Sequence, residues 1–541
     1  MAAHFRPFAR TTPMRPGLAA LAAVFLALLS PASAQPGALD PSFGSDGLAL
    51  GVTSSLGRDV ALDSDERIVF VGAQAPAGVP DGALVGRLLP DGSLDDSFAG
   101  DGIQSVSVLC PIAPRTILEA VEVAPDDAVV AAGTTGCRRG VVVRLLENGA
   151  PDHAFATVGV FTHNPDADSR SSAFFGVDVA PDGTVVAVGR EDRDEPGGEV
   201  RTYLLVVRLT PEGQPDVTFG TGGVVRLLVS DDLLPNSQLS DLVIYPDGRV
   251  LATGHVTIGG AVHSVAVRLN ADGTPDATFE GGGLVVHDLG DGNSDAAHAL
   301  VYGPDGAIYL GGSLLADNTF AFFAARLRFD GTRDPSFGAN GVAVVQAAAG
   351  ASCVARDVVL DLQGRLALAG DCAQSSNQLW AIARVLPDGG RDSSFGEAGV
   401  ARPPAPGTTQ TLYGLVRQGD GRLVVGGSVV TSGIPVWAVA RVIEEAVSAT
   451  DAASANGAPA LAVAPNPAAS AARIRFALDA ATVTTVTLHD ALGRMASRLD
   501  AGALPAGAHE REIDVSSLAP GVYVLRLQAG ARTVSRRLTV R

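Results

Sequence analysis

An arginine, an aspartate eight residues later and a phenylalanine three residues after that recur six times along this chain. Successive phenylalanines of the pattern lie about 55 to 64 residues apart. Self-similarity at a regular period is the sequence signature of a repeat architecture, so this spacing constrains the fold more than any other feature. The six sets, written as Arg/Asp/Phe, are Arg87/Asp95/Phe98, Arg144/Asp152/Phe155, Arg208/Asp216/Phe219, Arg268/Asp276/Phe279, Arg326/Asp334/Phe337 and Arg384/Asp392/Phe395.

The two ends of the array carry complementary fragments of the same unit. Asp40 and Phe43 open the array without a preceding arginine, and Arg441 closes it without a following aspartate. An open solenoid, the alternative, needs atypical capping repeats at both ends, whereas joining these two fragments completes a seventh unit. We therefore expect a closed ring in which Asp40 lies beside Arg441.

Each unit carries four short segments typical of β-strands. In one unit they span 223–229, 240–245, 249–255 and 264–269, and they are rich in apolar or β-branched residues. An Asp-Gly turn links the second segment to the third, and a glycine such as Gly254 stands where the third is expected to end. Because repeated four-stranded sheets are typical of β-propellers, the sequence predicts an all-β fold. We expect a seven-bladed β-propeller of four-stranded antiparallel blades, closed by its termini and followed by a small β-sandwich.

Loop lengths divide the expected propeller into two faces. The Asp-Gly turns and the turns that carry the Asp-x-x-Phe sequence are nearly constant in length, whereas the other two connections of each unit vary. In an antiparallel meander these two classes leave at opposite ends of the sheet, so the variation falls on one face, where binding is expected. Acidic residues occur in the variable loops: Asp166, Asp168, Glu191, Asp192, Asp194, Glu195, Asp231 and Asp232.

The repeat consensus resembles a known bacterial repeat. Its elements are Pro-Asp-Gly, Gly-Gly, Ala-Arg-Leu and Leu-Asp-x-Ser-Phe-Gly, which are similar to the delta-60 repeat. Segments 40–44 and 334–338 match almost letter for letter, and the resemblance covers roughly residues 39–443. It implies a propeller-like fold and supplies no established reaction. We expect the propeller to span 35–443.

Residues 1–34 are typical of an export signal. Three arginines precede a twelve-residue apolar run at 18–29, which is too short to span a bilayer, and an Ala-Ser-Ala cleavage site ends at residue 34. We therefore expect export to the periplasm, although a membrane anchor is the alternative. No later segment has the roughly 18 uninterrupted apolar residues of a transmembrane helix.

The chain contains four cysteines, and an exported protein meets an oxidising compartment where pairing is expected. Cys110 and Cys353 lie at or beyond the end of the first strand in their units. Cys137 and Cys372 lie just after the third strand in the same two units. This placement predicts the disulfides Cys110–Cys137 and Cys353–Cys372 on the variable face, with free thiols as the alternative.

The composition changes after residue 443. Residues 444–459 are rich in alanine and serine and are predicted to be a linker, and 460–541 carry five strand signals of a small β-sandwich. The sequences Pro-Asn-Pro at 465–467, Asp-Ala-Leu-Gly-Arg at 490–494 and Leu-Ala-Pro-Gly-Val-Tyr at 518–523 closely resemble the type A C-terminal sorting domain of the type IX secretion system. The resemblance implies the type IX machinery as a partner, passage across the outer membrane, removal of the domain, and release or surface attachment. An adhesive sandwich is the alternative.

The sequence offers no local catalytic motif. It lacks Gly-x-Ser-x-Gly, His-Glu-x-x-His, a phosphate-binding Gly-x-x-x-x-Gly-Lys and Cys-x-x-Cys. Recurrence in every unit favours a structural role for the arginine–aspartate pairs, the Arg441–Asp40 pair included, because a guanidinium can fork onto a carboxylate and hold a turn. The phenylalanines are expected to fill the gaps between neighbouring sheets.

One variable loop has the spacing of a metal site. Asp291, Asn293 and Asp295 place three oxygen ligands at alternate positions, as Ca²⁺ sites do, although the glycine and distal glutamate of an EF-hand loop are missing. We predict Ca²⁺ binding here and expect no other cofactor. A solvated acidic surface is the alternative interpretation.

The net charge narrows the range of functions. A formal charge of −19 argues against nucleic-acid binding, which needs clustered lysines and arginines. The favoured hypothesis is a secreted or outer-membrane-surface binding module for an extracellular protein or glycan. The alternatives are an extracellular hydrolase or lyase with its site on the variable face, and a scaffold with structural duty only.

Overall fold

The computed structural model describes residues 35–51, 54–74, 82–108, 110, 115–163, 168–229, 237–290, 294–303, 305–361, 363–445, 461–464, 468, 470–478, 481–490, 495–505, 507–518, 521–529 and 532–540. This part of the chain folds into β-strands, joined by turns and a short 3-10 helix, η2 (Glu280–Gly282). The expected export signal and most of the expected linker lie outside the described residues.

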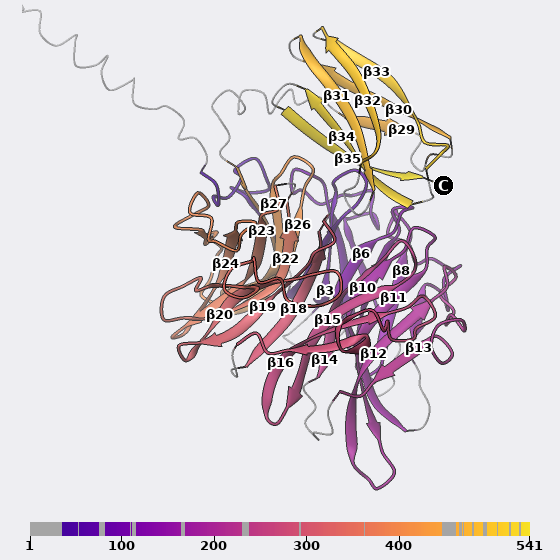
Figure 1. Cartoon of the computed structure of the whole chain (residues 1–541), viewed down its shortest axis with the longest axis vertical. Coiled ribbons are helices and arrows are strands. Elements are labelled where there is room, and N and C mark those ends of the chain that lie inside the picture. The colour runs from indigo at the N-terminus through magenta and orange to yellow at the C-terminus, as the bar shows by residue number, and fades with distance from the viewer. Residues whose placement is uncertain are drawn as a thin grey trace, which may run out of the picture.

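Seven four-stranded antiparallel sheets form the blades of a propeller, which confirms the predicted fold (Figure 1). From the axis outward, blades 1 to 4 are β2 (Ser55–Leu62), β3 (Ile68–Gln74), β4 (Gly82–Leu88), β5 (Ile103–Val106); β6 (Thr116–Val123), β7 (Val129–Thr135), β8 (Gly140–Leu145), β9 (Val160–Thr162); β10 (Ser169–Val179), β11 (Val185–Asp194), β12 (Val200–Leu209), β13 (Val224–Leu227); and β14 (Gln238–Ile244), β15 (Val250–Ile258), β16 (Ala261–Leu269), β17 (Leu284–His287). Blades 5 to 7 are β18 (Asp295–Tyr302), β19 (Ile308–Ala316), β20 (Thr319–Leu327), β21 (Val342–Val345); β22 (Ser352–Leu360), β23 (Leu366–Gln374), β24 (Asn377–Val385), β25 (Val400–Ala401); and β26 (Gln410–Arg417), β27 (Leu423–Thr431), β28 (Ile434–Val442), β1 (Leu48–Leu50).

The ring is closed by its two ends, as the complementary fragments predict. The outermost strand of blade 7 is β1, which comes from the start of the propeller and pairs antiparallel with β28, Leu48 opposite Ala440. A further bridge joins Leu39 to Val442. Closure in this way removes the free sheet edges that an open array would leave at its ends.

Apolar packing between neighbouring blades forms the core. The seven phenylalanines of the repeat are at most 2% exposed, and each lies in a cluster shared by two adjacent sheets. Phe98, for example, packs with Val85 of blade 1 and Leu118 of blade 2. Recurrence of the phenylalanine therefore follows from the need to fill the same gap seven times.

The third segments of the units do not end at their glycines, which corrects one sequence-based prediction. β15, for instance, continues past Gly254 to Ile258. Each glycine instead faces a bulge in the inner strand, and a Cβ atom there would lie 1.8 to 2.1 Å from a carbonyl oxygen of that strand. No Cβ atom is tolerated at such a distance, so any residue but glycine would force the backbone to shift. The seven are Gly72, Gly133, Gly189, Gly254, Gly312, Gly370 and Gly427.

The C-terminal strands form two sheets around a separate core (Figure 1). One sheet has the order β29 (Ala462–Ala464), β30 (Ala471–Leu478), β33 (Gly507–Asp514), and the other the order β32 (Met495–Leu504), β31 (Thr482–Asp490), β34 (Gly521–Ala529), β35 (Arg532–Val540). The sequence predicted five of these seven strands and missed β29 and β32. Among the described residues, no helix has the length and hydropathy needed to cross a membrane.

Candidate functional site

The arginine, aspartate and phenylalanine of each unit meet in one contact, which we call a latch. In all seven latches the arginine Nε lies 2.7 to 3.4 Å from the aspartate Oδ2, and this includes Arg441 and Asp40 at 2.8 Å. In five of them the guanidinium also lies over the phenylalanine ring, 4.4 to 5.0 Å from its centroid. The latches lie at the Asp-x-x-Phe turns, on the face opposite the variable loops, which we call the turn face.

Six of the seven latches also tie their blade to the next one, the exception among the described residues being the latch of Arg326. Arg87 of blade 1 donates through Nη1 to the carbonyl oxygen of Glu147 in blade 2, at 2.6 Å. Arg441 of blade 7 donates to the carbonyl oxygen of Pro90 in blade 1, so the series runs around the ring. These contacts assign the repeated residues to the assembly of the propeller.

Two latches differ from the other five. The guanidinium groups of Arg144 and Arg326 turn partly towards a second carboxylate in the neighbouring hairpin turn, with Nη2 2.6 Å from Oδ2 of Asp126 and Asp305 respectively. Their Nε atoms are 3.1 and 3.4 Å from the latch aspartates, Asp152 and Asp334. These units retain the pairing with poorer geometry.

The electrostatics of a latch favour the ion pair. Burial acts to raise the pKa of Asp276, but hydrogen bonds from Thr278 and the charge of Arg268 outweigh it and hold that pKa at about 2. Arg268 is fully buried and Asp276 nearly so. A buried charge of this kind is tolerated only when it is paired and hydrogen-bonded, so the latch aspartates are not free to act on a ligand.

The cysteines form two disulfides, Cys110–Cys137 and Cys353–Cys372. Cys110 lies in the connection between blades 1 and 2, and Cys137 in the turn between β7 and β8. Cys353 and Cys372 lie within β22 and β23, directly opposite each other, rather than in loops as expected. Both disulfides lie at the variable-loop end of their blades.

Of the three expected Ca²⁺ ligands, the structure places only Asp295. Asp291 and Asn293 lie outside the described residues, so Ca²⁺ binding there stays a prediction. Asp295 is the first residue of β18 and is 1% exposed. Its two oxygens accept hydrogen bonds from the backbone N–H groups of Ser264, at 2.9 Å, and Leu289, at 3.1 Å. This carboxylate therefore already joins blades 4 and 5.

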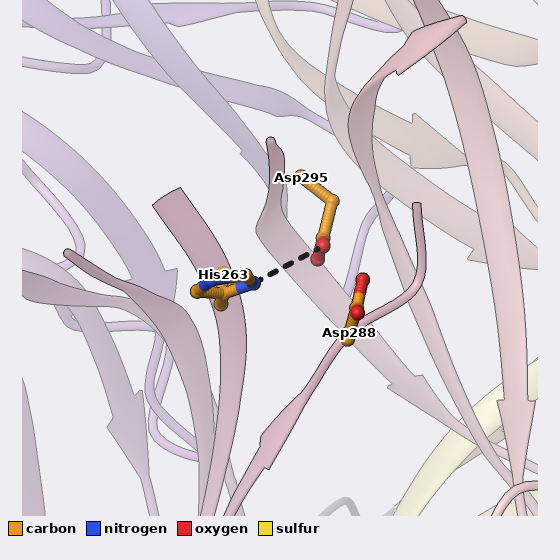
Figure 2. Close-up of side chains that lie close together, drawn as sticks. All are labelled: His263, Asp288 and Asp295. Atoms are coloured by element: carbon orange, nitrogen blue, oxygen red, sulfur yellow. Dashed lines mark ion pairs between the residues drawn. The ribbon is translucent and has the colours of Figure 1, made fainter. Parts of the chain in front are cut away.

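Asp295 belongs to a small cluster of side chains on the variable face (Figure 2). Nδ1 of His263 lies 3.9 Å from Oδ2 of Asp295, and one carboxylate oxygen of the exposed Asp288 lies within 4.8 Å of both. This trio has the residue types of a transition-metal site. Its buried carboxylate is hydrogen-bonded by the backbone, however, so the cluster by itself does not establish a metal site.

Several acidic residues that were expected in variable loops are parts of strands. Glu191, Asp192 and Asp194 belong to β11, because the hairpin of β11 and β12 extends well beyond its glycine. Glu191 is fully buried: burial raises its pKa, but His163, 3.7 Å away, and Arg226, which donates a hydrogen bond at 2.6 Å, more than offset this and hold the pKa at about 2. Asp166, Asp231 and Asp232 lie outside the described residues.

A second ring of residues, on the axis of the propeller, was not recognised from the sequence. Each inner strand contains a β-bulge opposite the repeated glycine, where one residue has no partner in the register. These bulge residues are all half-buried and line a central cavity of about 550 Å³. In blade order they are Arg58, Glu119, Phe175, Ser240, His298, Arg356 and Tyr413.

The charged side of this ring is formed by blades 6, 7, 1 and 2. The guanidinium groups of Arg58 and Arg356 lie over the ring of Tyr413, 4.5 and 4.8 Å from its centroid. Arg356 donates through Nε to Asp371, at 3.2 Å. Nε of Arg58 lies 3.5 Å from Oε2 of Glu119, and this buried atom has no hydrogen-bond partner among the described residues.

Carboxyl groups surround the cavity one residue beyond the bulges. Asp59, Asp241 and Asp357 each accept a backbone N–H bond from the inner strand of the following blade, at 2.6 to 2.9 Å. Burial raises the pKa of Asp59 and of Asp241 to about 7. Burial, followed by repulsion from the other two, raises the pKa of Asp357 well above its ordinary value. Burial likewise lowers the pKa of His298 to about 3, so this histidine is neutral at pH 7.

The sequence contained a signal for this ring. The residue four positions before the end of each inner strand is of six types in the seven units, while a valine or leucine stands two positions after it in every unit. Val354 to Val358 reads Val-Ala-Arg-Asp-Val, and Leu56 to Val60 reads Leu-Gly-Arg-Asp-Val. The signal is visible only once the bulge is known, because without it the alternation of the strand would assign these side chains to another face.

Two family matches cover parts of the chain. Residues 462–541 match the secretion system C-terminal sorting domain. Residues 64–98, 246–279, 303–337 and 418–442 match a domain of unknown function, DUF5122, described as a β-propeller, to which the delta-60 repeat is close. Comparison with curated proteins finds no match.

Solved structures of low similarity also align with the chain. PorZ, an essential surface component of the type IX secretion system of Porphyromonas gingivalis, is 13% identical, with 88% of this chain and 68% of that chain covered and a TM-score of 0.26. XC5397 of Xanthomonas campestris, a gluconolactonase, is 14% identical over 73% and 100% of the two chains, with a TM-score of 0.31. Sqt1 of Chaetomium thermophilum is 12% identical over 75% and 99%, with a TM-score of 0.38.

At these TM-scores the structural likenesses carry no argument about function. The sorting domain does indicate export, and the two disulfides are consistent with an extracellular location. The chain thus combines a seven-bladed β-propeller, parts of which match DUF5122, with a C-terminal segment that matches the secretion system sorting domain, and this segment indicates secretion to the cell surface.

Proposed function

We propose that the exported propeller is a non-enzymatic binding module, which takes an extracellular ligand on its variable face and at the adjoining end of the central cavity. The observation that carries this proposal is the contrast between two sets of equivalent positions. The latch residues are the same in all seven units, whereas the seven bulge residues comprise six residue types. Positions that serve the fold repeat, and a binding site breaks the symmetry of the repeat.

Location supports the same function. Each inner strand begins at a variable loop, and in six of the seven blades the bulge lies within its first five residues. The ring of bulge residues therefore lies near the middle of the inner strands, two to four residues from the variable face in these six blades. A cavity of about 550 Å³ has the size of an ordinary small-molecule site, which is roughly 300–1,000 Å³.

A glycan array and a pull-down with the exported protein, residues 35–541, would test this function. We expect saturable binding that an excess of the sorting domain, residues 460–541, does not compete away. Such binding would belong to the propeller. Absence of any retained glycan or protein would contradict the binding function and leave a structural scaffold or an enzyme as the remaining roles.

The alternative is an extracellular hydrolase or lyase. One observation favours it: Glu119, whose pKa is raised by burial, lies in the same cavity as Tyr413 and Arg58, and acid–base chemistry needs such groups together. Incubation with a panel of polysaccharides and peptides would decide between the two, because turnover releases new chain ends whereas binding leaves the substrate intact.

A further inference from the structure

The central cavity contains the groups needed to recognise one chemical class of ligand. Its charged side presents two guanidinium groups, Arg58 and Arg356, held on either side of Tyr413. Stacking on an aromatic ring restricts a guanidinium to one orientation. Its N–H groups then point outward in the guanidinium plane, where they can donate to a ligand. Guanidinium groups presented in this way bind carboxylates in preference to neutral acceptors.

The two arginines are not equally satisfied. Arg356 donates to Asp371, which also accepts from Gln378 at 2.7 Å, so this guanidinium is anchored within blade 6. Nε of Arg58 is buried without a hydrogen-bond partner among the described residues, and Glu119 is too distant for a good hydrogen bond. A buried donor without an acceptor costs free energy, and an anionic ligand would remove that cost.

The opposite side of the ring is of a different kind. Blades 3 and 4, which lie across the axis from Tyr413 of blade 7, contribute Phe175 and Ser240. An apolar ring face and a hydroxyl group suit the carbon face and the hydroxyl groups of a sugar. The cavity therefore places an anion-binding side and a sugar-binding side opposite each other within one space.

We propose that the central cavity binds an acidic sugar, with Arg58 and Arg356 receiving its carboxylate and Phe175 packing against its ring. This inference rests on the proposed binding function and names its ligand class. The carboxylate replaces Glu119 as the partner of Arg58. The ligand is a uronic acid, either free or at the end of a polysaccharide chain.

Calorimetric titration of the exported protein with glucuronate, galacturonate, oligogalacturonate and neutral glucose tests the proposal. We expect binding of the uronates and none of glucose, and tighter binding of the oligosaccharide identifies a polysaccharide end as the source. Arg58→Gln should weaken uronate binding about tenfold or more, since a charged hydrogen bond is lost. Arg170→Gln is the matched control: Arg170 is an exposed arginine of the variable face, paired with Asp194, and its loss should leave the affinity unchanged.

Glu119→Gln separates a binding role of Arg58 from damage to the fold. It removes the carboxylate that competes for Arg58, so we expect uronate binding to strengthen by about threefold or more. Loss of stability cannot produce tighter binding. Equal affinities of the Arg58→Gln and Arg170→Gln variants, or an unchanged affinity of Glu119→Gln, would overturn the cavity site while leaving the binding function intact. Uronates that fail to bind although the array retains another ligand would overturn the ligand class alone.

Discussion

The turn face and the central ring are built on the same seven units and show opposite behaviour. On the turn face, Arg384 and its six equivalents make the same ion pair with an aspartate in every blade. On the axis, the equivalent positions hold two arginines, an acid, a histidine, a serine and two aromatic residues. Residues that repeat in every unit hold the ring together. A binding function is therefore to be sought at equivalent positions whose residues differ between units.

The repeated glycines connect the two regions. Gly254 and its equivalents recur as strictly as the latch, yet their role is to make room for the bulge that turns a variable side chain towards the axis. The same bulge opposite a glycine thus recurs in every blade, while the side chain that it turns towards the axis varies. This explains why glycines that resemble strand ends are found in the middle of strands.

Removal of one buried latch arginine should produce the largest effect. Arg384→Ala leaves Asp392, which is 6% exposed, without its partner, and we expect the free energy of unfolding to fall by about 3–5 kcal/mol. Arg326→Ala is the control, because Arg326 is 22% exposed and pairs at 3.4 Å, and should cost about 1 kcal/mol or less. Urea unfolding curves give both values. Equal losses would mean that burial does not decide the strength of a latch.

Addition of a methyl group opposite a bulge should have the next largest effect. Gly254→Ala brings Cβ to 2.0 Å from the carbonyl oxygen of Gln238, so the backbone must shift at a cost of about 1–3 kcal/mol. Gly82→Ala is the matched control, since its nearest neighbour would be 3.5 Å away. Thermal unfolding of the two variants compares them. A stable Gly254→Ala protein would contradict the steric role of the glycine.

Acidity should affect the two regions with opposite signs. The pKa of Asp276 is held at about 2, below its ordinary value of about 3.9, so the stability that this latch contributes is lost as the pH falls from about 4 to 2. The pKa of Asp59 and of Asp241 is raised to about 7, so these carboxyls lower the stability as the pH rises from about 4 to 7. We expect the free energy of unfolding to be greatest near pH 4–5. In Asp276→Asn the free energy of unfolding should fall less steeply below about pH 4. An unchanged slope would assign acid unfolding to other groups.

Affinity for an acidic sugar should depend on the same cavity carboxyls. Below pH 7 Asp59 and Asp241 take up protons while the arginines stay charged, so an anion meets less repulsion. We expect glucuronate affinity to rise about five- to tenfold between pH 8 and pH 6, measured by calorimetry. Asp241→Asn should reduce this dependence. An affinity that falls as the pH is lowered would place the carboxylate away from the cavity.

The smallest effect concerns the predicted Ca²⁺ site. If Asp291, Asn293 and Asp295 hold the ion, saturating Ca²⁺ should raise the melting temperature by about 1–3 °C. Asp291→Ala should abolish the increase, whereas Asp317→Ala, in another turn of the variable face, should not. No increase at millimolar Ca²⁺ would remove the site.

Much of the fold could be predicted because the chain contains seven copies of one structural unit, which can be compared with one another. The number of blades, the closure and the two modules follow from spacing and composition, and the structure confirms the seven-bladed propeller. β29 and β32 were missed because they are short or poor in β-branched residues. Cys372 was placed just after a strand because the third strand was taken to stop at Gly370, whereas Cys353 lies in the part of the inner strand before the bulge, which the expected second strand did not include.

The candidate site was predicted less well. Attention went to the acidic residues of the variable loops, and Glu191 proved to be a buried partner of Arg226. Arg58, Arg356 and Tyr413 are separated by about 355 residues at most, and the Arg-Asp-Val sequence of the first two is absent at Tyr413, so no local pattern unites all three. Only the closed ring brings blades 6, 7 and 1 together.

The ring follows from the sequence alone, through its seven units, its complementary ends and the latch residues of every turn, and so does the sorting domain after the last blade. Each of these follows from residues whose role is local or repeated. Tertiary structure alone decided which side chains line the axis, because a bulge of a single residue changes the face to which every later side chain of the strand points. One bulge in each blade, opposite a glycine, brings seven residues that are distant in the sequence together around one cavity.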